Sequence, residues 1–464
     1  MDSINRYLGG VGGACAAAPV LRVLERLTVL WLVLVLVGPV QSQQTLSLSL
    51  EQARQRALAG NLLLEVARSE VERARALQVQ ALAGRLPQVR LSERALRSND
   101  AVDAFGFKLK QESFTEADFA VGRLNKPAAV TDFQTRLEIN QPLVGGQALY
   151  GRQQANAVLA VATSHLQRQE QEIVHRATTA YWGLVLAREE LKAVRQGLAT
   201  AQKLAALTQA HYQQQTVART DLLAAQMRVA ELAGEEIAAV NRIGQANDGL
   251  SLVLGLGSAV QLVPLDSLGR RPPLVDLSEL VVRARQMRPD LKALQYQVEA
   301  ARRGIQIEQA AYLPQLNAFA RMDLDADQAF ARQGESWMVG AVLQWDLFAG
   351  MSRVGAVRQA KARWDQARTQ DTYLQQQIER QVRQAVRGVA AAKRQIEVGR
   401  QAVGHAREGV RISQLQYTEG LITATDLLSA ETGLTRARIR HLQALYELEV
   451  ELGQLAFAVG QTVD

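Results

Sequence analysis

A stretch of this sequence occurs twice, as HYQQQTVARTDLLAAQ at 211–226 and as QYTEGLITATDLLSAE at 416–431. The copies share a tyrosine, an aspartate and two leucines: Tyr212, Asp221, Leu222 and Leu223 recur as Tyr417, Asp426, Leu427 and Leu428. Other landmarks recur in the same order: Leu86-Pro87-Gln88 as Leu313-Pro314-Gln315, and Gln141-Pro142-Leu143-Val144-Gly145-Gly146 as Trp345-Asp346-Leu347-Phe348-Ala349-Gly350. The repeated unit is too large for a solenoid repeat. The sequence therefore predicts a body of two pseudo-symmetric halves.

The distribution of proline indicates long helices. The chain has 464 residues, of which 48% are hydrophobic but only 5% aromatic. No proline lies between Leu143 and Val263, and none follows Pro314. Helix interiors exclude proline because it lacks the N–H and clashes with the preceding turn. The formal charge of +7 is spread among acidic residues, which favours solvated helix faces and argues against a nucleic-acid partner.

Residues 1–42 are predicted to be a signal peptide. An apolar run from Leu27 to Gly38 follows two arginines, and small residues near Ser42 offer a cleavage position. The alternative is a membrane anchor, for which the run is short. Cys15, the only cysteine, lies in this leader. The mature chain would therefore hold no disulfide and no thiolate metal site.

The mature chain is predicted to be mainly α-helical, with two repeats at 43–257 and 277–464. The linker at 258–276 contains Pro264, Pro272 and Pro273 and follows Gly255 and Gly257, so we expect it to have little regular structure. Each repeat begins with a helical stretch, which breaks near Gly60-Asn61 in the first and at Arg288-Pro289 in the second. Each repeat ends in long helices, expected at 147–214 and 221–254 and at 351–417 and 426–458.

Between the short and long helices, each repeat has a predicted β-hairpin, at about 88–143 and 315–347. Residues 131–141 alternate between apolar and polar side chains, and the polar set is Gln134, Arg136, Glu138 and Asn140. Strands of about ten residues can cross a bilayer with the apolar side toward lipid and the polar side toward a lumen. The alternative is a pair of soluble hairpins. We expect both hairpin tips, roughly 98–130 and 325–335, to be loops.

Four strands from one chain cannot close a barrel, and an open sheet in lipid would leave edge N–H and C=O groups unpaired. Chains would therefore have to share a barrel. Two copies would give eight strands, whose interior is nearly filled by side chains, whereas three would give twelve and an open lumen. The long helices would continue the wall on one side of the membrane, which indicates a conduit.

At the paired turns the sequence resembles the TolC family of outer-membrane efflux proteins. The resemblance rests on the two Leu-Pro-Gln segments, on the glycines Gly146 and Gly350, and on the segment 417–428 with its copy in the first half. It implies a homotrimer in the outer membrane, with a twelve-stranded barrel and a helical tunnel through the periplasm. It also implies a periplasmic adaptor and an inner-membrane pump as partners.

By this resemblance, the adaptor would dock in two grooves at the turns. One groove is assigned to Gly420, Leu421, Thr425, Asp426 and Leu428, and the other to Thr220, Asp221 and Leu223. Tyr417 and Asp426 are the gate candidates, although Ile422 and Ser429 replace charged residues that close the tunnel in the best-known members. Asp221 and Asp426 each follow a threonine and could instead cap a helix. The first turn has Gln215 where the second has Gly420, which leaves room for a different backbone.

No catalytic or cofactor-binding motif stands out. The five histidines are scattered along helices without metal-ligand spacing: His165, His175, His211, His405 and His441. Two functions remain. One is a passive outer-membrane exit duct, and the other is a periplasmic helical scaffold or adaptor that never spans the membrane. The mixed charges of the polar strand positions do not identify the cargo.

Overall fold

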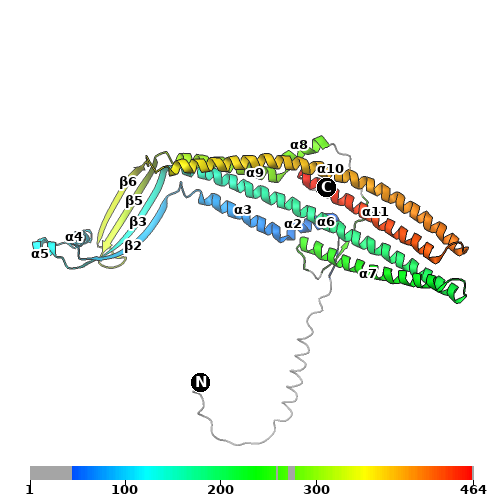
Figure 1. Ribbon diagram of the computed structural model, residues 1–464. Coiled ribbons are helices and arrows are strands. Elements are labelled where there is room, and N and C mark those ends of the chain that lie inside the picture. Colours follow the sequence, from blue (N-terminus) through cyan, green and yellow to red (C-terminus); the bar gives the residue numbers. More distant parts are fainter. Residues whose placement is uncertain (1–43, 258–259, 270–276, 462–464) are drawn as a thin grey trace, which may run out of the picture.

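The computed structural model describes residues 44–257, 260–269 and 277–461. Figure 1 shows an elongated molecule with a β-sheet at one end and two helical turns at the other. The predicted signal peptide lies outside the described residues. Within them, no helix is both long and apolar enough to cross a membrane.

The first half contains β1 (Gln44–Leu48), α2 (Leu50–Gly60), α3 (Leu62–Gln80), β2 (Gln88–Ser98), α4 (Ala101–Lys110), η1 (Glu116–Phe119), α5 (Val121–Asn125), β3 (Val130–Val144), α6 (Gly146–Gln213) and α7 (Arg219–Val253). The second half contains β4 (Val260–Pro264), α8 (Leu277–Met287), α9 (Pro289–Ala310), β5 (Gln315–Ala326), β6 (Gly334–Gln344), α10 (Ser352–Thr418) and α11 (Ala424–Val459). The order of helices, hairpin and long helices therefore repeats, as the sequence predicts.

Both predicted helix breaks are confirmed, and each has a local cause. Asn61 caps α3 by accepting a hydrogen bond of 2.9 Å from the N–H of Leu63. Arg288 precedes Pro289, the first residue of α9, and its side chain is only 2% exposed. Its guanidinium donates to the carboxylate of Asp290 at 3.0 and 2.5 Å and to Gln381 on α10 at 2.6 Å. The side chain of Arg288 thus holds the junction between α8 and α9 against the long helix α10.

The two hairpins form one antiparallel sheet in the order β2-β3-β5-β6. The pairing of β3 with β5 joins the halves, and it places Leu137 opposite Met322. Directly opposite residues point to the same side of a sheet. One face of the sheet therefore collects most of the apolar side chains, and the other collects most of the polar ones. Glu93 and Glu335 are polar exceptions on the first face, and Met338 and Val342 are apolar exceptions on the second.

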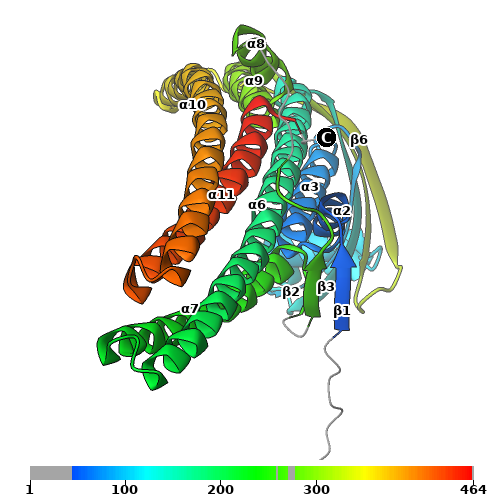
Figure 2. The ribbon, with the colours of Figure 1, turned by 90° about the vertical axis from the view of Figure 1, so that its right-hand side faces the viewer.

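The long helices α6 and α10 contain 68 and 67 residues, so each spans on the order of 100 Å at 1.5 Å per residue. Each folds back into a shorter partner, so that α7 packs along α6 and α11 packs along α10 (Figure 2). Alanines buried between them, including Ala201 and Ala225, allow close packing of the helices.

The main core lies at mid-length, where α2, α6, α7, β1 and β4 meet around Tyr181 and Trp182. The Tyr181 hydroxyl donates to Leu48 O at 3.1 Å or Asp266 Oδ2 at 2.7 Å, and it accepts from the N–H groups of Leu265 and Asp266 at 3.2 Å. Here β4 pairs in parallel with β1. The prediction of little regular structure in 258–276 was therefore wrong at β4. A strand of five residues gives only a weak alternation of apolar and polar side chains, and β1 and β4 are far apart in the sequence. The sequence therefore did not predict their pairing.

The prediction that 98–130 is a loop was also wrong. Residues 99–129, which we call the cap, fold into α4, η1 and α5 around edge-to-face contacts of Phe114 with Phe105 and Phe119. Lys108 donates to Asp118 at 2.7 Å and ties α4 to η1. The other hairpin is closed by residues 327–333, without helix or strand. The first hairpin therefore carries a folded unit at its outer end, whereas the second ends in a short loop.

Candidate functional site

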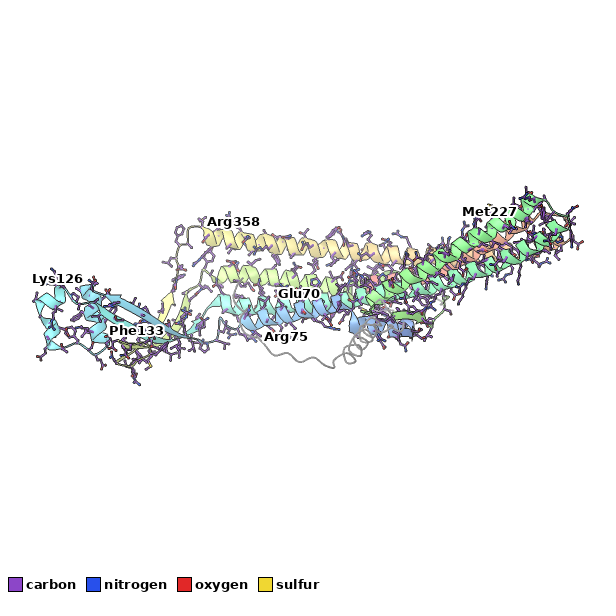
Figure 3. All side chains as sticks on the ribbon, turned by 90° about the horizontal axis from the view of Figure 1, so that it is seen from below. Glu70, Arg75, Lys126, Phe133, Met227 and Arg358 are labelled. Carbon is purple, nitrogen blue, oxygen red and sulfur yellow. The ribbon has the colours of Figure 1, made fainter. Side chains whose placement is uncertain are left out.

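The predicted site residues lie in two places, the end formed by the two helical turns and the polar face of the sheet. We call residues 208–229 and 415–432 the turn end. In Figure 3, Met227 marks this end, and Phe133 marks the sheet at the opposite end.

The two turns have the same backbone conformation. Gly420 has a φ of 71°, and Gln215 at the matching position has a φ of 60°. In the second turn, Gly420 and Leu421 donate to the carbonyls of Tyr417 and Gln416 at 3.1 and 2.8 Å. The first turn repeats both bonds, from Gln215 to Tyr212 at 2.9 Å and from Thr216 to His211 at 3.0 Å. The expectation of a different backbone was wrong, because these bonds hold Gln215 in a left-handed conformation that costs a non-glycine residue about 1–2 kcal/mol.

Asp426 takes part in a helix cap, whereas Asp221 does not. The Asp426 carboxylate accepts from the N–H and hydroxyl of Thr423 at 3.1 and 2.7 Å, while Thr423 Oγ1 accepts from the N–H of Asp426 at 3.2 Å. The Thr423 side-chain bond is the main cause that lowers the pKa of Asp426 below its ordinary value. The first turn has Ala218 at the Thr423 position, and no side chain caps α7. The same aspartate therefore has different contacts in the two copies.

Tyr417 connects the second turn to the first half. Its hydroxyl oxygen lies 3.3 Å from Thr208 Oγ1 on α6, and its ring meets the ring of His211 edge-on at 6.4 Å. Thr208 donates its own proton to Leu204 O at 2.9 Å, which leaves its oxygen to accept from Tyr417. Tyr417 thus ties the helical hairpin α10–α11 to α6.

The remaining predicted docking residues divide by exposure. Leu428 is 7% exposed and packs with Leu204, Ala225 and Leu427 between the halves. Leu421 and Leu223 are 73% and 52% exposed. The other predicted docking residues, Thr220, Thr425, Asp426 and Gly420, are exposed, and Asp221 is half-buried. The turn end therefore presents two exposed leucines, one beside each turn, above a buried apolar layer.

On the sheet, the four predicted polar positions lie on one face and are bonded. Arg136 donates to both oxygens of Asp323 at 2.6 and 3.1 Å and to Gln134 at 3.2 Å. Gln134 donates to Asp325 at 3.0 Å, and Asn140 donates to Glu138 at 3.0 Å. These bonds link β3 to β5 and give the face both signs of charge.

The opposite face is mostly apolar and is exposed. Leu91 on β2, Leu137 on β3 and Trp337 on β6 are 67%, 40% and 76% exposed. Trp337 and Trp345 stand eight positions apart, and about 3.3 Å per residue places them roughly 26 Å from each other along the chain. At a strand tilt of about 40° this corresponds to roughly 20 Å of height, which fits within the lipid-facing band of about 25 Å between the aromatic girdles of an outer-membrane sheet. The sheet thus has the polarity of a membrane wall.

Sequence reasoning missed four residues that contribute to these sites. Thr423 begins a Thr-x-x-Asp pattern, which is a readable capping signal. Asp323 and Asp325 have no role in the sequence analysis, because their role depends on the register of β5 with β3. Gln111, described below, lies in the cap and has no sequence signal.

Comparison with known proteins gives a consistent result. A family model described as outer membrane efflux protein matches residues 53–256 and 280–461. The alkaline protease secretion protein AprF of Pseudomonas aeruginosa is 25% identical over 336 residues, which cover 71% of this chain and 69% of AprF. The outer membrane efflux protein BepC of Brucella suis is 24% identical over 361 residues, which cover 74% of this chain and 76% of BepC.

Solved structures share the fold. The CmeC outer membrane channel of Campylobacter jejuni matches with a TM-score of 0.78 and 15% identity, covering 89% of this chain and 86% of that chain. The outer membrane protein VceC of Vibrio cholerae matches with a TM-score of 0.74 and 20% identity, covering 89% of this chain and 97% of that chain. The family model spans both halves and both turns. The chain belongs to the outer membrane efflux protein family.

Proposed function

We propose that three copies of this protein form the outer-membrane exit duct of a tripartite efflux or type I secretion system. The observation that carries the proposal is the four-stranded sheet, whose apolar face is exposed and whose polar face is bonded within the chain. In the described chain β2 and β6 pair on one side only. Three sheets joined through these edges give three times four, or twelve, strands around a water-filled lumen.

In this arrangement the outer membrane surrounds the sheet, and the helices α6, α7, α10 and α11 extend into the periplasm. The duct is passive, with no catalytic role, and the two repeats at 43–257 and 277–464 supply equivalent parts of its wall. The cargo is set by the pump. The names of AprF and BepC point to a secreted protease and to efflux, so the relatives span both kinds of system.

The turn end is the proposed docking surface for a periplasmic adaptor. Leu421 and Leu223 are exposed beside the two turns, at positions that do not match in the repeat, so each chain offers two separate apolar contacts. Thr220, Asp221, Thr425 and Asp426 surround them with polar groups, and buried Leu428 supports the surface from beneath. An apolar centre with a polar rim is typical of protein interfaces.

The proposed gate lies at the same end. Tyr417 bonds α10 to Thr208 of α6, so any outward movement of α10–α11 relative to α6 has to break this contact. Adaptor binding would favour the open arrangement by binding it more tightly than the closed one. Asp426 bonds only to Thr423 within the described chain, so its first role is to cap α11.

Electron microscopy of detergent-purified protein tests the duct. Class averages should show three-fold particles more than ~100 Å long, as the helix lengths require. A monomeric rod that stays soluble without detergent would overturn the duct and favour the alternative, a periplasmic scaffold. Fractionation gives an independent control, because high salt alone should fail to extract a protein whose sheet lies in the membrane.

A further inference from the structure

The cap lies on the polar face of the sheet. Gln111, which follows α4, is 5% exposed, and its amide nitrogen lies 2.9 Å from Asp132 Oδ1, 2.9 Å from Thr131 O and 3.2 Å from Ala326 O. Asp132 and Gln134 are separated by two positions on β3 and therefore share a face. Gln111 thus bonds to the face that carries Gln134 and Arg136.

A second contact fixes the cap on the same face. Gly334 on β6 lies opposite Asp325 on β5, so a side chain at 334 would point to the polar side. There is no room for one, because the carbonyl oxygen of Lys110 occupies the space where a Cβ would stand. The end of α4 therefore lies directly against the backbone of β6, while Gln111 reaches β3 and β5.

The cap covers part of the polar face even in a single chain. Asp132, Gln134 and Asp325 are 0%, 3% and 2% exposed. They lie at the end of the sheet farthest from the long helices, and Lys126 marks the far part of the cap beyond them (Figure 3). The helix α4 contacts β3, β5 and β6. The cap thus occupies lumen-side space at the outer end of the sheet.

We propose that the three caps form a constriction at the extracellular mouth, which limits the size of cargo that can leave the duct. This inference rests on the proposed trimeric barrel. Twelve strands about 4.8 Å apart, tilted by about 40°, have a circumference of roughly 75 Å and a diameter of roughly 24 Å. A helix with its side chains is about 10 Å wide. Three α4 helices on the inner wall therefore leave a narrow passage.

The second hairpin would not produce this narrowing. The second hairpin ends in residues 327–333, which contain no helix or strand, so it contributes little bulk at the mouth. The cap also has its own core, since Ala104 and Phe107 are 1% and 6% exposed. A folded unit of this kind keeps its width, whereas a mobile loop would yield to passing cargo. The cap therefore limits the width of the extracellular mouth, and it does so independently of the turn end at the opposite end of the molecule.

Cysteine labelling of intact cells tests the constriction. Cys15 is the only native cysteine, so a Cys15→Ser background carries no thiol. Glu138→Cys places a thiol on the polar face six residues from Asp132, or about 20 Å deeper along β3. We expect N-ethylmaleimide to label it and a large poly(ethylene glycol) maleimide to be excluded. When residues 99–129 are replaced by a copy of 327–333, both reagents should label it.

Gln111→Ala provides a milder variant that keeps the cap but removes the contacts of the Gln111 amide with β3 and β5, and it should admit the large reagent in part. Arg332→Cys, in the exposed short loop, should react with both reagents in every background and so confirms that each variant reaches the surface. Labelling of Glu138→Cys by the large reagent with the cap intact would overturn the constriction. Exclusion that persists without the cap would also overturn it.

Leu137→Cys separates failure of the constriction from failure of the duct. Leu137 lies on the apolar face, which the duct places against lipid. A thiol in lipid stays protonated and therefore unreactive, so neither reagent should label it. Labelling of Leu137→Cys as readily as Glu138→Cys would mean that the sheet is not a barrel wall. The proposed function would then fail, whatever the cap does.

Discussion

Tyr417 of the second half and Thr208 of the first half approach within 3.3 Å, and this bond ties α10 to α6 near the turns. Thr208 is fully buried, and its hydroxyl donates its proton in a hydrogen bond to Leu204 O. The pairing is asymmetric within the pseudo-symmetric chain. Tyr212, the counterpart of Tyr417, is 37% exposed, and its hydroxyl has no hydrogen bond among the described residues. Only the second half therefore fastens its turn through this tyrosine.

Tyr417→Phe should make the duct easier to open. The change removes one partly buried hydrogen bond, worth about 1 kcal/mol, which corresponds to a roughly five-fold shift toward the open arrangement. Single-channel recording in planar bilayers should show more frequent open events. Tyr212→Phe removes the unbonded hydroxyl from the matching position and should leave the recordings unchanged. Equal behaviour of the two variants would remove Tyr417 from the gate.

Asp426→Ala and Asp221→Ala should differ, although the two aspartates occupy matching positions. The first change removes the capping box of α11, whereas the second removes no cap. Hydrogen exchange should accelerate at the start of α11 in Asp426→Ala and stay unchanged at the start of α7 in Asp221→Ala. An increase in conductance without faster exchange would assign Asp426 to the gate and not to the helix cap of α11.

The pH dependence of the α11 helix cap follows from the direction in which the pKa of Asp426 is shifted. The pKa of Asp426 is lowered in the folded chain, so its contribution is fully present above the ordinary aspartate range and is lost as the pH falls through the lowered value. The protection factor at the start of α11, which is corrected for the intrinsic pH dependence of exchange, should therefore fall only in acid. The start of α7, with Ala218 in place of Thr423, provides the internal control.

Regular, long elements of this fold could be predicted from the sequence, and contacts that depend on tertiary structure could not. Alternation along β3 and the absence of proline from α6 and α10 were enough to place the hairpins and long helices. The conformation of Gln215 was missed because the two backbone bonds override a side-chain preference. The cap was missed because its helices are short, and its position depends on Gln111 and Gly334, which meet only in the folded sheet.

The Tyr181 hydroxyl should be important for the mid-length core. It lies against four groups from Leu48, Leu265 and Asp266, and Tyr181→Phe leaves the half-buried N–H of Asp266 without its partner, at a cost of about 1–2 kcal/mol. Thermal unfolding in detergent should begin at a lower temperature. Tyr446→Phe is the control, because Tyr446 borders the same cluster with no hydrogen bond from its hydroxyl among the described residues. An unchanged melting temperature in Tyr181→Phe would contradict this role.

Alkaline pH should weaken the same core. Burial is the main cause that raises the pKa of Tyr181 from 10.0 to about 12. A raised pKa means that the folded state favours the protonated phenol, so this stability is fully present below pH 10 and is lost as the pH rises toward 12. The melting temperature of the wild type should fall across this window more steeply than that of Tyr181→Phe.

Ion selectivity tests whether the polar face lines the pathway. Asp323 neutralises Arg136 and lies 3.8 Å from Arg321, so Asp323→Asn leaves two guanidinium groups without their carboxylate partner. The lumen then carries more positive charge, and the reversal potential in a salt gradient should shift toward anions. Asp327→Asn removes the same charge from the exposed short loop and should shift the potential less. If both variants behave like the wild type, ions do not pass along this face, and the assignment of Gln134, Arg136, Glu138 and Asn140 to the lumen is wrong.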